Sequence, residues 1–336
     1  MEPRRKLGRL LVAGVICLVV AGVAVGVVAY YRSPVAVVTT GQSGAWDAVA
    51  AQGPTVIWNP DLGLYQMWYD GRTAGQSVVA IGYATSQDGE VWTKYTGNPV
   101  IPADARWPCV LYEPEDSAAP YKIWFNVGRG VEIAHATSMD GIHWTSFQTV
   151  LERGPLGSYD DSNVAAPCVA KANSGYWMYY DAGTSAIPSP EQWGHYLAVA
   201  TSPDGVTWTK RQTVLERGAA GSWDADRVFN ATVIQSNGLF EMWYVGAGKD
   251  ASGASTRNIG YASSSDGVHW TKSAQNPVVQ GTQVAEEYDY NVSAASVLKE
   301  QNAYKVWFTA LTKDSGIASN LRVGYAEYPL DSWAKP

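Results

Sequence analysis

Beyond residue 31, apolar and polar residues alternate in short runs that predict β-strands and no helix. Five runs rich in aromatic residues, such as "YQMWYDG" around Trp68 and "YKIWFNVG" around Trp124, each follow an apolar run such as "GPTVIW" or "WPCVLY". Four of the five precede a variant of "IGYATSQDGEVWTK", which starts at Ile81. Short alternating runs between turn residues are typical of half-buried strands. The pattern therefore predicts four short strands in each repeat.

The repeats return at nearly even spacing. Their aromatic centres, Trp68, Trp124, Tyr179, Trp243 and Trp307, are 55 to 64 residues apart. Repeats of four strands with Trp- and Gly-marked turns are typical of propeller blades. We therefore expect an all-β fold, a five-bladed β-propeller over residues 33–336, with blades at about 46–99, 100–153, 154–217, 218–281 and 282–336.

The first segment of the propeller indicates how the ring closes. The run "VVTTGQSGAWD" matches "VLERGAAGSWD" of the fourth repeat, where it is expected to form an outer strand that leads into the next blade. The last repeat has no such strand. We expect residues 35–40 to supply it and so to close the ring.

The repeated Asp-Gly pair is expected to form a two-residue hairpin turn, because glycine accepts positive φ. The Trp three residues after each glycine, at 92, 144, 208 and 270, is expected to fill the gap between neighbouring blades. A residue type that is present in nearly every blade does not single out one site. These turns are therefore predicted to be scaffold.

The N-terminal segment has the features of a membrane anchor. Four basic residues among the first nine precede an uncharged run of 22 residues, 10–31, and about 20 apolar residues span a bilayer. We expect residues 1–32 to form a cytoplasmic basic tip and a transmembrane helix, with the propeller outside the cytoplasm. A cleaved signal peptide is the alternative, and it gives an extracytoplasmic propeller too.

Charge and composition narrow the class of partner. A net charge of −7, with no basic cluster beyond the N-terminus, argues against nucleic acid. No His, Cys or acidic cluster has metal-ligand spacing, so we expect no metal or cofactor, and we expect a monomer. Cys109 and Cys168 follow prolines at the same repeat position. They either pair in an oxidising compartment or remain small buried residues.

The motifs "MWYDG", "IGYATSQDGEVWTK" and "GNPV" carry a resemblance. Over residues 35–333 the chain resembles the five-bladed propeller glycosidases of the family 43 and 32 type (arabinanases, xylosidases, invertases and levansucrases) and the related mannoside phosphorylases. The resemblance implies a substrate at the mouth of the central funnel and paired carboxylates acting as acid and as base or nucleophile.

The chain departs from this family at one position. The family's inner strands commonly carry an Asp directly before a proline. The matching residues here are Gly53, Trp107, Ala166, Asn230 and Ala295. The expected catalytic aspartates therefore have no counterpart at these positions.

Residues on the expected mouth face that differ between blades are the candidates for a site. The catalytic candidates are Asp161, Asp226 and Glu287. The candidates for binding a sugar offer planar hydrogen-bonding groups or an aromatic face, and they are Arg106, Trp107, Asn163, Trp193, His195, Arg227, Asn230 and Asn291. Trp193 and His195 belong to the long loop "DAGTSAIPSPEQWGHY", which is expected to reach over the funnel. The alternative for each residue is a solvated loop position, or a surface pair between Asp226 and Arg227.

These features favour a membrane-anchored, extracytoplasmic carbohydrate-active protein of the glycoside hydrolase type. The alternative is a propeller without catalysis that binds glycan or protein at the cell surface. Two carboxyl groups roughly 5 to 9.5 Å apart at the mouth would favour hydrolysis.

Overall fold

The computed structural model describes residues 35–73, 75, 79–102, 104–128, 130–172, 175–187, 195–280, 291–311 and 321–333. Secondary structure in these ranges is all β. None of their segments is a helix long and apolar enough to cross a membrane. The transmembrane helix expected in 1–32 lies outside the described residues.

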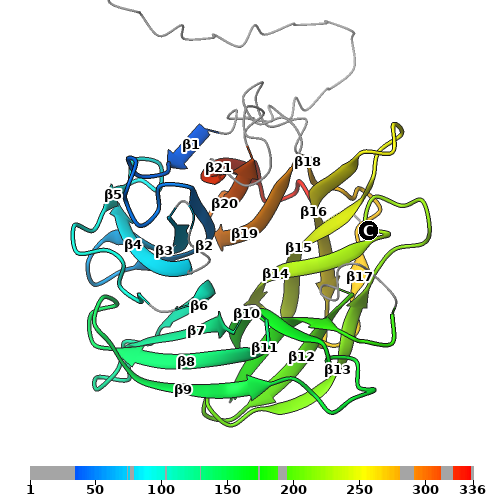
Figure 1. Cartoon of the computed structure of the whole chain (residues 1–336), viewed down its shortest axis with the longest axis horizontal. Helices are drawn as coiled ribbons and strands as arrows, with labels where there is room; N and C mark the ends of the chain where they lie inside the picture. Colours follow the sequence, from blue (N-terminus) through cyan, green and yellow to red (C-terminus); the bar gives the residue numbers. More distant parts are fainter. Residues whose placement is uncertain are drawn as a thin grey trace, which may run out of the picture.

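The strands form sheets arranged around a central axis, and the first strand of each sheet lies nearest the centre (Figure 1). We call the four-stranded units blades 1 to 5. Blade 1 comprises β2 (Ala50–Asn59), β3 (Leu64–Arg72), β4 (Val79–Ser86) and β5 (Thr93–Lys94). Blade 2 comprises β6 (Arg106–Tyr112), β7 (Tyr121–Val127), β8 (Glu132–Ser138) and β9 (Trp144–Glu152). Blade 3 comprises β10 (Asn163–Ala172), β11 (Gly175–Gly183), β12 (Tyr196–Ser202) and β13 (Thr209–Glu216).

The remaining strands complete the ring. Blade 4 comprises β14 (Arg227–Ser236), β15 (Leu239–Lys249), β16 (Ser255–Ser264) and β17 (Thr271–Lys272), and β18 (Val279–Gln280) also pairs with β16. Blade 5 comprises β19 (Val292–Lys299), β20 (Ala303–Leu311), β21 (Leu321–Pro329) and β1 (Val35–Val38).

Blade 5 takes its outer strand from the start of the described chain. Strand β1 lies antiparallel to β21, with Val35 opposite Tyr325 and Val38 opposite Val323. A further bridge joins Ala50 of β2 to Leu321. The first and last blades therefore form one continuous eight-stranded sheet.

Neighbouring blades are joined by a repeated aromatic contact. The indole of Trp68 in blade 1 donates a hydrogen bond to the carbonyl of Gly141 in the Asp-Gly turn of blade 2, at 2.8 Å. The ring of Trp144, which follows that turn, packs edge-on against Trp68 at 6.3 Å. Trp124 and Trp307 donate to the carbonyls of the Asp-Gly turns of the next blades in the same way. Each turn is thus a structural contact between blades.

The Asp-Gly turn is longer than the two-residue hairpin that the sequence pattern suggests. In blade 1 the residues between Ser86 and Thr93 form the turn. The Asp88 carboxylate accepts the amides of Glu90 and Val91 at 2.8 Å, and the Ser86 hydroxyl accepts the amide of Gly89. The prediction of a two-residue turn was wrong because these side chains replace the cross-strand hydrogen bonds.

The inner strands define two faces of the ring. We call the face where inner strands begin and second strands end the mouth. The opposite face, which carries the turns after inner strands and the Asp-Gly turns, is the underside. Within blade 1, Ala50 and Arg72 lie opposite each other at the mouth, and Asn59 and Leu64 do so at the underside.

Candidate functional site at the mouth of the funnel

Each inner strand bends at the same point near the mouth. The register slips by a bulge there, and the residue at the bend has positive φ: 57° at Gly53, 48° at Trp107, 45° at Ala166, 48° at Asn230 and 47° at Ala294. These positions match the family's Asp before proline. In blade 5 the matching residue is Ala294, so the sequence alignment at Ala295 was wrong by one position.

The amide group at the bend is held by a side chain from the second strand of the preceding blade. Asp70 on β3 accepts the amide of Trp107 at 2.7 Å, and Asp181 on β11 accepts the amide of Asn230 at 2.7 Å. Asn126 on β7 does the same for Ala166 at 3.2 Å. The second strands thus direct two carboxyl groups toward the mouth, from blades 1 and 3.

Both carboxyl groups are fully buried, and burial raises the pKa of Asp70 and the pKa of Asp181 well above that of an ordinary aspartate. The amide of Trp107 and the charge of Arg106 oppose the shift at Asp70. The amide of Asn230 and the charge of Arg227 oppose it at Asp181. Two carboxyl groups that retain their protons above the usual pH are suited to proton donation.

Asp70 keeps one oxygen uncommitted. Its Oδ2 is buried and has no hydrogen-bond partner among the described residues. A Cβ at position 53 would lie 3.4 Å from this oxygen and 3.2 Å from Cδ1 of Trp107. Glycine at position 53 therefore lets the Asp70 carboxyl and the Trp107 ring pack closely against the bend of β2.

Several candidates from the sequence gather around these two carboxyl groups. We call Asp70, Arg106 and Trp107 the Asp70 cluster. The Asp181 cluster comprises Asp181, Asn163, Arg227 and Asn230. The amide of the Asn163 side chain donates to the Asp181 carbonyl at 3.3 Å, and Arg106 pairs with Asp104 at 3.5 Å.

Arg227 is buried and packs against an aromatic ring. Its guanidinium lies 5.2 Å from the centroid of the Phe229 ring, and that of Arg257 lies 5.7 Å from it. Asn291 forms a bridge with Arg257 at the mouth end of blade 4, and its side-chain oxygen is buried.

The described catalytic candidates from the sequence, Asp161 and Asp226, adjoin the Asp181 cluster along the chain, but the contacts that follow lie outside it. Both oxygens of Asp161 are engaged, by the amide of Gly157 at 2.7 Å and by the amide and hydroxyl of Ser185 at 2.6 and 2.7 Å. These bonds lower the pKa of Asp161 to about 2. Asp226 is exposed, and its amide donates to the Ala247 carbonyl at 2.9 Å. Glu287 lies outside the described residues.

The long loop of blade 3 is described only at its two ends. His195 is buried, and its Nδ1 accepts the amide of Thr184 at 3.4 Å. The hydrogen bond joins the two described ends of the loop. The prediction that His195 reaches over the funnel was wrong, because the imidazole is buried inside the blade. Trp193 lies outside the described residues.

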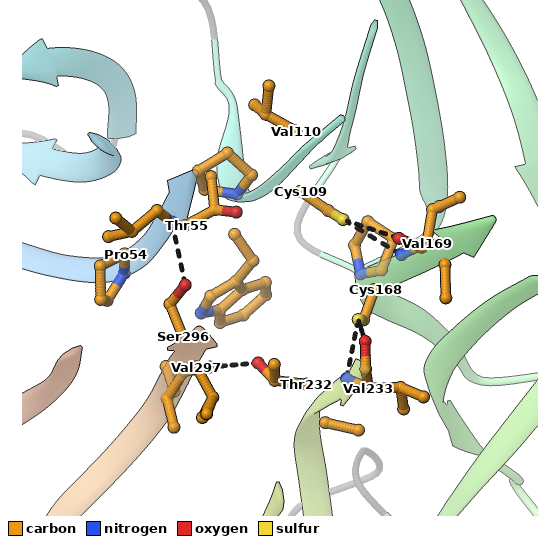
Figure 2. Close-up of a pocket in the computed structure, with 18 of the residues that line it drawn as sticks. Pro54, Thr55, Cys109, Val110, Cys168, Val169, Thr232, Val233, Ser296 and Val297 are labelled. Atoms are coloured by element: carbon orange, nitrogen blue, oxygen red, sulfur yellow. Dashed lines mark hydrogen bonds between the residues drawn. The ribbon is translucent and has the colours of Figure 1, made fainter. Parts of the chain in front are cut away.

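Below the bends, a narrow channel of about 290 Å³ runs between the inner strands. One small polar side chain from each blade lines it at the same level: Thr55, Cys109, Cys168, Thr232 and Ser296. Figure 2 shows this ring; the Ser296 hydroxyl accepts the amide of Val56 at 2.9 Å, and the Cys109 sulfur accepts that of Val169 at 3.0 Å. Cys109 and Cys168 are free and buried. These bonds tie blade 5 to blade 1 and blade 2 to blade 3 along the channel.

The described residues contain no cluster of three or more His, Cys, Asp or Glu side chains that could hold a metal ion. The described residues of the mouth offer carboxyl groups, guanidinium groups and an aromatic ring.

The second-strand aspartates were missed in the sequence, although a signal was present. At the position two residues after each aromatic centre the blades carry Asp70, Asn126, Asp181, Val245 and Thr309. This position varies between blades, as a site position does. Its aspartates stand inside the aromatic strand runs, such as "YQMWYDG", whose other residues form the scaffold.

A ring of five blades is the architecture that the resemblance to the propeller glycosidases implies. A family model of glycosyl hydrolases family 43 matches residues 96–335. The chain belongs to this family.

The chain is also similar to a protein of Mycobacterium tuberculosis that is described as uncharacterized. The two are 29% identical over 230 residues, which cover 63% of this chain and 72% of that protein.

Three solved structures share the fold. The catalytic domain of a GH62 α-L-arabinofuranosidase from Coprinopsis cinerea has a TM-score of 0.69 at 12% identity, covering 91% of this chain and 98% of its own. An N-acetylgalactosamine deacetylase from F. plautii has a TM-score of 0.68 at 17% identity, covering 89% and 96%. A glycosyl hydrolase from Bacteroides ovatus has a TM-score of 0.62 at 18% identity, covering 90% and 92%.

Proposed function

We propose that this chain is a membrane-anchored, extracytoplasmic glycoside hydrolase that takes an oligosaccharide or polysaccharide at the mouth of the funnel. Membership of glycosyl hydrolases family 43 supports the class of substrate. The apolar run 10–31 and its basic flank support the membrane placement. The observation that carries the proposal is the pair of buried carboxyl groups with raised pKa, Asp70 and Asp181.

Hydrolysis of a glycosidic bond needs a carboxylic acid that protonates the leaving oxygen and a carboxylate that activates water or attacks the sugar. Asp70 is the better proton donor, since its Oδ2 has no hydrogen-bond partner among the described residues and lies close to Gly53 at the bend, as the Trp107 ring does. The Trp107 ring offers an apolar face for a sugar, and Arg106 a donor for a hydroxyl. Asp226, which is exposed, and Glu287 remain the proposed carboxylates.

One observation favours the alternative, a propeller that binds glycan without cleaving it. Asp70 and Asp181 both hold a backbone amide, as Asn126 and Thr309 do at the equivalent positions. If that bond is their whole role, asparagine should replace them without loss.

The experiment uses this equivalence. The full chain is screened for release of sugar from aryl glycosides and polysaccharides, and Asp70→Asn and Asp181→Asn are then compared with the wild type. Because Asn126 shows that asparagine holds the bend, both variants should keep the thermal stability of the wild type or exceed it. We expect at least one of them to lose 10²-fold or more in kcat, the usual contribution of a general acid.

Two results would contradict hydrolysis by these groups. Glycan binding without sugar release from any substrate would establish the binding protein. Sugar release that both asparagine variants retain in full would place the acid elsewhere, and Glu287→Gln is then the next variant.

A further inference from the structure

Exposed apolar side chains gather on the underside of blade 1. Trp58 and Leu62, at the turn between β2 and β3, are 44% and 58% exposed, and Val91 in the Asp-Gly turn is 73% exposed. Met139, in the corresponding turn of blade 2, is 62% exposed. We call these four residues the underside patch. The mouth differs, because its exposed large apolar side chain among the described residues is Leu156.

A groove adjoins this patch at the seam between blades 5 and 1. It has a volume of about 740 Å³ and is lined by Trp58, Tyr65 and the turn from Lys299 to Ala303. The Trp58 ring lies 4.8 Å from that of Tyr65. Lys305 lies over the Tyr65 ring at 4.6 Å. Tryptophan, tyrosine and lysine together are the residues that favour the interface between water and lipid.

The first residue of β1 points toward the same face. Strand β21 runs from the mouth at Leu321 to the underside at Pro329, and β1 is antiparallel to it. Going back from Val38 to Val35, the chain therefore heads for the underside of blade 5, which neighbours blade 1.

The segment between the apolar run and β1 is short. Only residues 32–34 separate the end of the run at 31 from Val35. Three extended residues reach about 10 Å. If the run spans a bilayer, the propeller has no room to stand away from the membrane surface.

We propose that the underside patch rests on the outer surface of the bilayer that holds residues 10–31, with the funnel mouth turned away from the membrane. This inference rests on the membrane anchor of the proposed function and names the surface that it brings into contact. Trp58 and Leu62 lie in the interfacial region. Among the acidic residues nearby, Asp61 accepts the Tyr112 hydroxyl, and Asp88 accepts amides of its own turn.

The arrangement predicts access to the site. A mouth that faces outward takes polymers from the medium or the outer envelope. It does not take lipid headgroups of its own membrane.

The test measures the depth of two labels in the full chain, reconstituted in phosphatidylcholine nanodiscs. Environment-sensitive fluorophores are placed at Val91→Cys on the underside and at Leu156→Cys on the mouth loop, which is 90% exposed. Both variants carry Cys17→Ser. Cys109 and Cys168 are buried and remain unlabelled.

Doxyl-labelled lipid should quench the label at position 91 several-fold more than the label at position 156. Adding Leu62→Asp should reduce the quenching at 91, whereas Leu239→Asp, on the underside of blade 4, should leave it unchanged. Equal quenching at 91 and 156, stronger quenching at 156, or a chain that fails to stay in the nanodisc would overturn the proposal. The label reports depth whether or not the protein hydrolyses a glycan, so the outcome is separate from that of the activity screen.

Discussion

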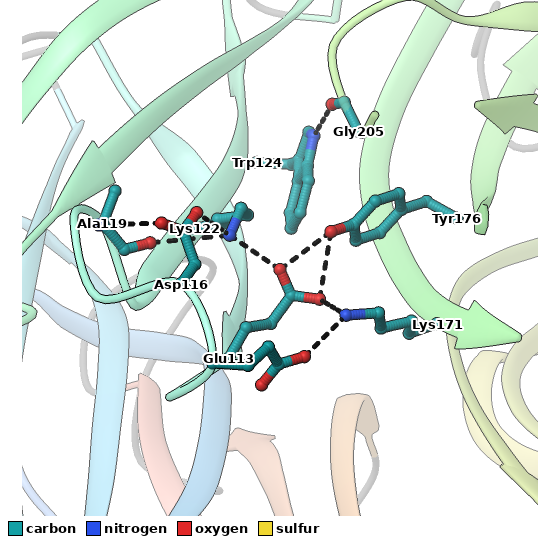
Figure 3. A network of polar contacts seen from close by, with 9 residues as sticks. Glu113, Asp116, Ala119, Lys122, Trp124, Lys171, Tyr176 and Gly205 are labelled. Atoms are coloured by element: carbon teal, nitrogen blue, oxygen red, sulfur yellow. Dashed lines mark hydrogen bonds and ion pairs between the residues drawn. The ribbon is translucent and has the colours of Figure 1, made fainter. Parts of the chain in front are cut away.

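Replacing Glu113 by glutamine should weaken the seam between blades 2 and 3. Glu113 follows β6 and is buried there, where its carboxylate pairs with Lys122 at 2.7 Å and Lys171 at 2.6 Å and accepts the Tyr176 hydroxyl at 2.8 Å (Figure 3). The variant leaves two ammonium groups without their shared carboxylate.

The free energy of unfolding that Glu113→Gln loses depends on how exposed the partners of the carboxylate are. Breaking a fully buried ion pair by removing one partner costs about 3–5 kcal/mol. Glutamine keeps a hydrogen-bond acceptor for Tyr176, and the Lys171 side chain is 45% exposed and stays hydrated. We therefore expect a loss of about 2 kcal/mol in the free energy of unfolding at pH 7.

The loss should depend on pH. Burial alone would raise the pKa of Glu113, but hydrogen bonds from Lys122, Lys171 and Tyr176 outweigh it and hold the pKa below the ordinary value of 4.5. A carboxyl whose pKa is lower in the folded state stabilises fully above its unfolded value, and that contribution is lost as pH falls. The difference between wild type and variant should shrink below about pH 4.5.

The assay is equilibrium urea denaturation of both proteins from pH 3 to pH 8. Glu115→Gln is the matched control, because Glu115 also pairs with Lys171, at 2.8 Å, from an exposed position. It should leave the free energy of unfolding nearly unchanged, because an exposed ion pair is screened by water. Equal losses for the two variants, or a Glu113→Gln loss that stays constant down to pH 3, would refute the reasoning.

Three further predictions concern the mouth and the turns. Asp70→Asn should stabilise the protein, and the gain should grow as pH rises above about 4, because the folded wild type favours the protonated acid. The gain is about 1.4 kcal/mol for each pH unit until the raised pKa of Asp70 is reached. Urea denaturation that gives the same gain at pH 4 and pH 8 would contradict it. Gly141→Ala should lower the free energy of unfolding by about 3 kcal/mol and Gly157→Ala by about 1 kcal/mol. Both glycines have positive φ, but only at 141 would the new Cβ lie 2.8 Å from the Trp68 ring. Thermal unfolding compares the two variants, and equal losses would count against the blade contact. Asp161→Asn should speed amide exchange at residues 157 and 185, whose amides its carboxylate accepts, while unchanged exchange would show that the two loops hold without it.

Much of the scaffold was predictable, because its repeats leave a periodic record in the sequence. Strands around Trp68 and Trp124 alternate with turn residues, and the turn glycines recur with them. Because every blade makes the same contacts, each copy of the motif supports the interpretation of the others. The match between 35–40 and the outer strand of the fourth repeat pointed to the segment that β1 occupies.

The site was less predictable, because it depends on geometry that no single repeat encodes. The bulge before Pro108 turns the amide of Trp107 toward the preceding blade, where Asp70 accepts it. Asp70 and Trp107 are brought together by this blade-to-blade packing. His195 shows the converse, since a histidine in a long loop resembles a site residue in sequence but is buried at the base of its loop.

The central claim is that Asp70 and Asp181 hold their protons at the mouth to a higher pH than an ordinary aspartate does. Infrared difference spectroscopy over a series of pH values above the ordinary pKa of 3.8, wild type minus the double variant Asp70→Asn with Asp181→Asn, measures this directly. The account predicts the carbonyl band of a protonated carboxylic acid in the wild type. Carboxylate bands alone, with no protonated acid, would contradict it.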